Sequence, residues 1–274
     1  MMSSIRPQLS EKERAARDVF ARLAADADRF EGYAHPHAAR VAAIADELAA
    51  RFGLGRDDRS NLHVAALAHD LGEASMARDY IKRDGALTDE ERLDLARHPV
   101  IGEQEAARAG AERGAQLIVR WHHEWWDGTG YPDALRARQI PLPARILRAA
   151  DAYAALTDDR PFRRALTEEA ARKHLAEWVG LEFDPRVVRA LLSLRDLPEL
   201  RSYARGNEGG GGREALMRES AEADRAGSDR DGRERAEVDR SGVDLAQPVR
   251  AEGDRGEVGG SVESGVDEWG VPRR

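Results

Sequence analysis

Helix-period spacing of apolar residues is the feature that most limits how this chain can fold. In the segment HAARVAAIADELAARF, apolar residues recur every three or four positions, at Val41, Ile44, Ala45, Leu48 and Phe52. This spacing puts them along one stripe of an amphipathic helix. Alternating apolar and polar residues, which indicate strands, are hard to find between residues 1 and 205. The sequence therefore predicts an all-α fold.

Boundary signals predict where several helices begin and end. The segment NLHVAALAHDLG is expected to form a buried helix that ends at Gly72. In LTDEERLDLARHP, Thr88 is the expected N-cap, Glu91 follows three residues later, and the helix ends before Pro99. Further helices are expected for GAQLIVRWHHEWW, for PARILRAADAYAALT, and for TEEAARKHLAEW, which opens at Thr167.

The composition changes near residue 205, which divides the chain. Residues 206–274 are rich in Gly, Asp, Glu, Arg and Ser, and Trp269 is their only aromatic residue. Such a segment buries too little apolar surface to offset the entropy of ordering it, so we expect a disordered charged tail. Residues 31–205 are the expected folded domain, and residues 1–30 an N-terminal helical extension. About 200 ordered residues suffice for one core.

Composition also excludes several classes of site and location. The 274 residues include no cysteine, so disulfides and thiolate metal sites are excluded, and any metal must be held by His, Asp, Glu or water. There is no run of 18 apolar residues and no apolar signal segment, so we expect a cytoplasmic protein without a membrane span. The net charge of −8 argues against binding to a DNA or RNA polymer.

Several ionisable residues stand on, or at the ends of, apolar helical segments, and each has an ordinary structural explanation. His37 shares the core-facing stripe of its helix, where a hydrogen-bonded core histidine is common. The pair His69–Asp70 ends an apolar run, and a buried Asp needs a partner. His98 stands beside Pro99, where a histidine can cap a helix C-terminus. The pair His122–His123 fits a surface pair, and Asp151 fits a buried salt bridge with an Arg.

Taken together, these five histidines and two aspartates favour a metal site. Mixed imidazole and carboxylate ligands suit Mn, Fe or Zn rather than Mg alone. Seven ligands exceed the need of one ion and fit two ions about 3.5–4 Å apart, a geometry used in phosphoryl hydrolysis. On a helix, the adjacent His122 and His123 diverge by about 100°, so they can reach different ions.

The motifs, in their order, resemble the HD-GYP domains of the HD phosphohydrolase superfamily. The resemblance covers about residues 31–195. It rests on HAARV at His37, the HD pair at His69, RHPVIG at His98, and the signature loop HHEWWDGTGYP at 122–132. It continues through IPLPARILRAADAYAALTDDRPF, which contains Asp151, to the FDP triplet at 183–185. A lone HD pair is weak evidence, whereas the ordered set with the signature loop is very specific.

The resemblance implies a helical bundle with a dinuclear metal centre in its core and hydrolysis of cyclic di-GMP to pGpG or GMP. Two divalent ions are implied, Fe or Mn first, with Zn, Mg or Ni as alternatives. A metal-bound hydroxide would attack the phosphodiester, and Asp70 would bridge the ions. The implied metal ligands are His37, His69, Asp70, His98, His122, His123 and Asp151.

The resemblance also implies a substrate cleft beside the signature loop. Gly128, Gly130, Tyr131 and Pro132 would shape its rim, and Arg145 would be a phosphate or structural partner. The expected substrate is a cyclic dinucleotide or another nucleotide. A protein partner would meet the signature loop or the tail.

Three positions depart from the family pattern. Glu73 stands where the family has a catalytic-site lysine, Tyr33 replaces the third-metal Glu, and Ala154 replaces a second Asp, which would loosen ligand orientation. A carboxylate at position 73 would oppose charge on the phosphoryl oxygens. Glu73 has four candidate roles: a metal ligand, a partner of Arg78, a partner of a ligating His, or a residue pointing away. Its spacing from Asp70 predicts that it faces the metal cleft.

These departures leave three functions open. The first is an active cyclic di-GMP phosphodiesterase, with Asp70 and Glu73 at catalytic positions. The second is a catalytically weakened metal-binding module for signalling or interaction. The third is an HD phosphohydrolase that acts on another nucleotide.

Overall fold

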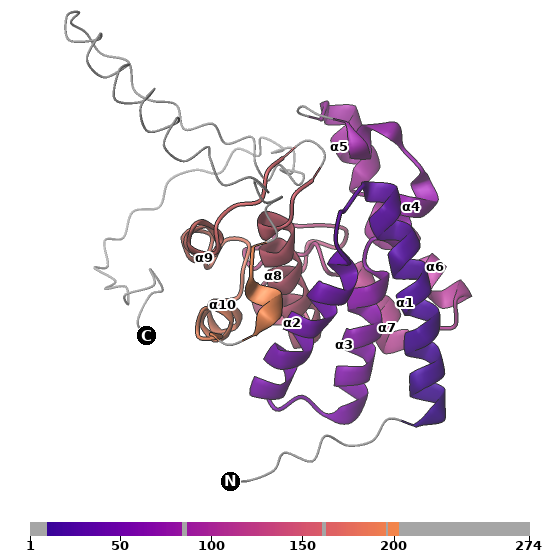
Figure 1. Cartoon of the computed structure of the whole chain (residues 1–274), viewed down its shortest axis with the longest axis horizontal. Coiled ribbons are helices and arrows are strands. Elements are labelled where there is room, and N and C mark those ends of the chain that lie inside the picture. The colour runs from indigo at the N-terminus through magenta and orange to yellow at the C-terminus, as the bar shows by residue number, and fades with distance from the viewer. Residues whose placement is uncertain (1–9, 84–86, 161–162, 196, 203–274) are drawn as a thin grey trace, which may run out of the picture.

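The computed structural model describes residues 10–83, 87–160, 163–195 and 197–202, and these residues form an all-α bundle, as expected (Figure 1). Within them there is no strand, only two isolated β-bridges. The expected tail at 206–274 lies outside the described residues. The α-helices are α1 (Glu11–Glu31), α2 (His37–Arg51), α3 (Arg56–Ala68), α4 (Leu71–Met76), α5 (Asp89–Leu95), α6 (His98–Arg108), α7 (Arg113–Arg120), α8 (Leu142–Thr157), α9 (Glu168–Glu177) and α10 (Pro185–Leu192). Three short 3₁₀ helices are η1 (Asp79–Lys82), η2 (Ala137–Gln139) and η3 (Pro198–Leu200).

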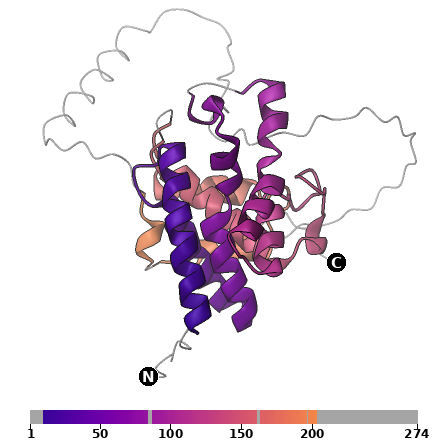
Figure 2. The same cartoon turned by 90° about the vertical axis from the view of Figure 1, so that its right-hand side faces the viewer.

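Helix α2 lies at the centre of the bundle because its apolar stripe is covered on both sides. It packs against α3 and α8, while α4 packs against α6, and α6 against α7. Figures 1 and 2 show α1 along one side of the bundle, with α9 and α10 on the side away from it. Most of the stripe predicted from the sequence is buried, since Val41, Ile44, Ala45 and Leu48 have no exposed surface. Its last residue, Phe52, follows the helix and is partly buried.

Helix α1 contributes to this same core. Phe20, Ala24 and Ala27 are buried on the face of α1 that packs against α3 and α4. Ser10 caps the helix with a capping box, and Gly32 ends it in the left-handed conformation. Helix α1 therefore packs as part of the bundle, and the expected boundary after residue 30 stays a prediction.

The helix starts marked by threonine are confirmed. Thr88 accepts a hydrogen bond from the Glu91 N–H and completes a capping box, and Thr167 caps α9. Other predicted boundaries are wrong. Helix α3 ends at Ala68, not at Gly72, and α7 ends at Arg120, before His122. His98 begins α6 rather than ending α5.

Two local features explain why Gly72 and Pro99 were misread as helix-ending signals. Gly72 lies inside α4, where a Cβ would overlap the His98 main chain, so this glycine permits a close helix contact instead of ending a helix. Pro99 occupies the first turn of α6, a position where its fixed φ and missing N–H are tolerated. None of the described helices is long and apolar enough to span a membrane.

Candidate metal centre

The fold brings all seven predicted metal ligands to one buried region. Helix ends supply most of them: His37 begins α2, His69 and Asp70 link α3 to α4, His98 begins α6, and His122 and His123 follow α7. Asp151 comes from the middle of α8. No member of the set is more than 9% exposed.

Three of the histidines are oriented by the same local contact. In each, Nδ1 lies within hydrogen-bond distance of the carbonyl oxygen three residues earlier, and this contact places the proton on Nδ1. In the neutral ring, Nε2 then carries the lone pair and faces the centre of the site, as in a metal ligand. The pairs are His69 with Ala66 (2.9 Å), His98 with Leu95 (2.8 Å) and His122 with Val119 (2.6 Å).

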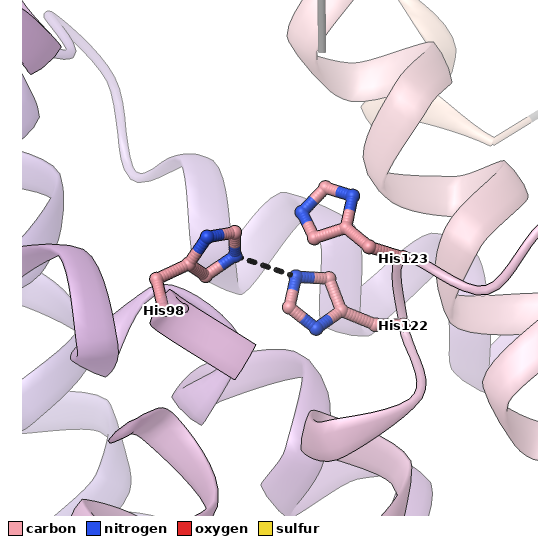
Figure 3. A group of neighbouring side chains, drawn as sticks. All are labelled: His98, His122 and His123. Carbon is pink, nitrogen blue, oxygen red and sulfur yellow. Dashed lines mark hydrogen bonds between the residues drawn. The ribbon is translucent and has the colours of Figure 1, made fainter. Parts of the chain in front are cut away.

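One group of donors comprises His98, His122 and His123, whose rings converge (Figure 3). The Nε2 atoms of His98 and His122 are 3.3 Å apart. Because both Nδ1 atoms donate to carbonyls, both Nε2 atoms carry lone pairs in the neutral rings, so this contact calls for a shared cation or proton. Burial, then repulsion from His98, lowers the pKa of His122 to about 3, and burial also lowers the pKa of His123 well below its usual value. Neutral rings are the form that binds metals.

A second group comprises His37, His69 and Asp70, with Asp151 beside it. Asp151 Oδ1 lies 3.4 Å from His37 Nε2 and 3.6 Å from His69 Nε2. Both of these Nε2 atoms are buried and face carboxylates, but neither makes a contact with hydrogen-bond geometry. Buried polar atoms without partners are costly, and a divalent cation would satisfy both nitrogens and the facing carboxylate at once.

Asp70 joins the two groups. Its Oδ2 lies 2.9 Å from His69 Nε2, and its Oδ1 lies 3.9 Å from His98 Nε2. Burial alone would raise the pKa of Asp70, but attraction from His69 outweighs burial and lowers that pKa to about 2. An ionised carboxylate with one oxygen toward each group is arranged as a bridging ligand would be.

Glu73 faces the site, as its spacing from Asp70 predicted. It is 7% exposed, it groups with Asp70 and His98, and its Oε1 lies 3.9 Å from His98 Nδ1. The alternative pairing with Arg78 is wrong, because Arg78 donates to Asp94 at 2.9 Å. Burial, followed by repulsion from Glu31 and Asp70, raises the pKa of Glu73 well above its usual value.

The signature loop packs directly on His123, one of its own two histidines. The ring of Tyr131 stacks on that of His123, with centroids 5.0 Å apart, and its N–H donates to the His123 carbonyl at 3.1 Å. Gly130 makes this approach possible, since a Cβ there would overlap the main chain of Trp125 and His123. Gly128 has a φ of +85°, which favours glycine, and the Tyr131–Pro132 peptide bond is cis.

Arg145 is engaged by a carboxylate within the protein. Its guanidinium pairs with Asp184, the Asp of the FDP triplet, and stands 5.6 Å from the ring centroid of Trp126. Asp184 also caps α10 by accepting from the Arg186 N–H. These contacts favour the structural role that the sequence left open for Arg145 over the phosphate role.

Sequence reasoning missed two charged residues beside the centre. Arg148, only 2% exposed, pairs with Glu182, and its Nη1 lies 3.3 Å from both Asp151 Oδ2 and His123 Nδ1. Asp151 thus forms the buried salt bridge with an Arg that was the alternative to a metal role. It also faces His37 and His69. Asp158 Oδ2 lies 2.9 Å from His37 Nδ1. An Arg three residues before Asp151 in an apolar helix was a sequence signal for the first of these contacts.

The sequence profile of the HD domain family matches residues 18–187. The chain belongs to the HD domain family. The family expected from the motifs is therefore confirmed, and the match begins inside α1. The donors assembled in the site, imidazoles and carboxylates without thiolates, fit the divalent cations that such domains bind.

Named relatives match part of the chain. The chain is 36% identical over 187 residues to the cyclic di-GMP phosphodiesterase response regulator RpfG of Xanthomonas campestris. This match covers 67% of this chain and 49% of the relative. It is 31% identical over 158 residues to 3'3'-cGAMP-specific phosphodiesterase 2 of Vibrio cholerae, covering 57% of this chain and 30% of the relative. The chain therefore spans about half or less of the length of these relatives.

A solved structure shows the same fold. A cyclic GMP-AMP specific phosphodiesterase of V. cholerae, V-cGAP3, superposes with a TM-score of 0.55 at 18% identity. The superposition covers 68% of this chain and 50% of that one. The two chains thus share one helical fold over this part.

Proposed function

We propose that this chain is a metal-dependent phosphodiesterase that hydrolyses cyclic di-GMP, using two divalent ions, iron or manganese. The observation that carries the proposal is the pairing of two donor groups by Asp70. One group is His37, His69 and Asp151, and the other is His98, His122 and His123. The cyclic di-GMP phosphodiesterase among the relatives supports the substrate.

The histidines and the aspartates have different roles in the proposed site. Neutral His98, His122 and His123 offer lone pairs without competing protons, and ionised Asp70 and Asp151 supply negative charge. When bound, two divalent cations would polarise the phosphodiester and lower the pKa of water toward about 7. The buried surroundings keep competing water out and strengthen each electrostatic contact.

Tyr131 is the residue of the signature loop that we expect to contact the substrate. Its Oη is buried without a hydrogen-bond partner, and its ring is held against His123. A phenol hydroxyl without a partner beside the donor groups is available to donate to a phosphate or sugar oxygen. Gly130 and Pro132 fix the main chain around it, so the loop orients this hydroxyl without a large entropic cost on binding.

The decisive experiment is turnover by the full chain. Protein reconstituted with Mn²⁺ or Fe²⁺ should convert cyclic di-GMP to pGpG or GMP, as resolved by liquid chromatography. His122→Gln should abolish turnover, and His63→Gln is the matched control, because His63 pairs with Asp46 outside the site. Absence of turnover of any cyclic dinucleotide by protein that holds two ions would overturn the proposal. That result would favour the metal-binding module instead.

A second substrate is favoured by one observation, the match to a 3'3'-cGAMP-specific phosphodiesterase. Cyclic di-GMP and 3'3'-cGAMP share the phosphodiester ring and differ in one base. The same assay with both substrates, compared by kcat/KM, assigns the preference. Turnover of only a nucleotide monoester or linear nucleotide would identify an HD phosphohydrolase of another class.

A further inference from the structure

We propose that Asp158 is the positioning residue for His37, and that Arg40 fixes Asp158 for this task. This inference rests on the proposed function, because it takes His37 to be a metal ligand. Asp158 Oδ2 lies 2.9 Å from His37 Nδ1, and both side chains are buried. A carboxylate that accepts the Nδ1 proton leaves Nε2 with a lone pair, directed to the side where Asp151 Oδ1 lies 3.4 Å away.

The orientation of His37 is achieved differently from that of its neighbours. His69, His98 and His122 each contact a main-chain carbonyl of their own turn. His37 is the first residue of α2, and its Nδ1 instead meets a side chain that lies 121 residues further along the chain. A charged acceptor holds an imidazole N–H more strongly than a carbonyl does and makes the ligand more basic. The ring of Tyr33 stacks on one face of the His37 ring, with ring centroids 4.1 Å apart.

Arg40 balances the charge of Asp158 and fixes its orientation. Arg40 Nη1 donates to Asp158 Oδ1 at 2.7 Å, so the two carboxylate oxygens are divided between Arg40 and His37. The rest of the guanidinium is anchored by Thr157 Oγ1 at 2.7 Å and by the carbonyls of Glu199 and Arg201, both at 2.6 Å. A buried ion pair is favourable only when its remaining hydrogen bonds are made, and here they are.

Asp158 compensates for the carboxylate that is missing at Ala154. The sequence led us to expect looser ligand orientation, because an Asp is missing at that position. In the structure Ala154 contributes only its carbonyl, 3.2 Å from Arg40 Nη1, while the next turn ends at Asp158. The carboxylate that orients a ligand is therefore supplied four residues later, immediately after α8.

The test compares two variants that each change one His–carboxylate contact. Asp158→Asn replaces the charged acceptor beside His37 Nδ1 by a neutral amide, and Asp46→Asn makes the same change at the 2.8 Å contact to His63 outside the centre. Calorimetric titration of the full chain with Mn²⁺ should show one of two sites weakened about 10- to 100-fold in Asp158→Asn. Affinity in Asp46→Asn should match wild type. Two sites of wild-type affinity in Asp158→Asn would overturn the inference.

A second measurement is needed because Asp158→Asn leaves Arg40 buried without its charge partner, which destabilises folding. Nitrogen-15 spectra of histidine-labelled, Zn²⁺-loaded full chain report which ring nitrogen carries the proton, and the His37 signals are identified by their loss in His37→Gln. We expect His37 to be protonated at Nδ1 and to ligate through Nε2. Protonation at Nε2 would overturn the inference. Because this measurement uses the wild-type chain, it does not depend on whether Asp158→Asn folds.

These readouts separate this inference from the proposed function. Wild-type chain that binds two ions but hydrolyses no cyclic dinucleotide would overturn the proposed function alone. The role of Asp158 would then still be decided by the Mn²⁺ affinities and the His37 spectra. Conversely, full turnover with unchanged metal affinity in Asp158→Asn would overturn the role of Asp158 and leave the phosphodiesterase proposal intact.

Discussion

Gly72 lies directly against the main-chain carbonyl of His98, so closely that a Cβ at position 72 would overlap the oxygen. This contact joins α4 to the start of α6. It brings Asp70 and Glu73, on either side of the glycine, within reach of His98. The close crossing of two short helices therefore sets the spacing between the two donor groups.

We expect Gly72→Ala to push α4 away from α6 and to lower the free energy of unfolding by about 1–3 kcal/mol. Mn²⁺ affinity should fall with it, because Asp70 moves. The control is Gly55→Ala before α3, where a Cβ would meet nothing within 4 Å. Chemical denaturation and metal titration provide the readouts. Equal effects from the two substitutions would show that the Gly72 contact does not set the site.

Glu73 is the departure with the clearest catalytic consequence. Burial raises the pKa of Glu73 in the metal-free protein, but two bound cations beside it would favour its ionised form. An ionised carboxylate near the phosphate opposes the charge that builds in the transition state, so Glu73→Gln should raise kcat/KM for cyclic di-GMP by up to about tenfold. Glu73→Lys should raise it further by supplying a positive charge. Glu105→Gln, on the exposed side of α6, is the control. A loss of both turnover and bound metal in Glu73→Gln would instead make Glu73 a ligand.

Much of this site was predictable from the sequence, and the reasons differ between residues. The His and Asp ligands could be found because polar residues on apolar helical stripes are rare, and motif order then linked them. The contacts of Asp158 with His37 and of Arg148 with Glu182 could not, because they join side chains that are far apart in sequence. The ends of α3 at Ala68 and of α7 at Arg120 were placed too late because no Gly or Pro follows either of them directly.

Metal binding should strengthen as the pH rises toward about 9. In the metal-free protein, burial opposes a charged His37 ring, but Asp151 and Asp158 outweigh burial and raise the pKa of His37 to about 9. A cation binds Nε2 only after its proton leaves, so binding at pH 7 releases this proton. Calorimetry in two buffers with different ionisation enthalpies measures the release. In Asp158→Asn the release should be smaller, and no release in wild type would contradict the prediction.

Glu31 makes the metal-free protein less stable in mildly basic solution. Burial and repulsion from Asp70 raise its pKa to about 8, above the unfolded value near 4.5. The folded state therefore holds a proton that the unfolded state releases, and this contribution to stability is full below pH 4.5 and is lost as the pH rises to about 8. The slope from this group is at most about 1.4 kcal/mol per pH unit. Thermal unfolding of Glu31→Gln should show a flatter pH dependence than that of wild type, whereas an identical profile would rule Glu31 out.

Removing one partner of the buried Arg148–Glu182 pair should lower the free energy of unfolding more than replacing both partners by apolar residues. Both side chains are at most 5% exposed, and Arg148 also reaches Asp151 and His123. Arg148→Met leaves Glu182 buried without a partner and should lower the free energy of unfolding by about 3–5 kcal/mol, while Arg148→Met with Glu182→Leu should recover most of that loss. Mn²⁺ affinity should not recover in the double variant, because Asp151 and His123 have still lost the guanidinium that holds them. Recovery of stability and metal affinity together would reduce Arg148 to a packing residue.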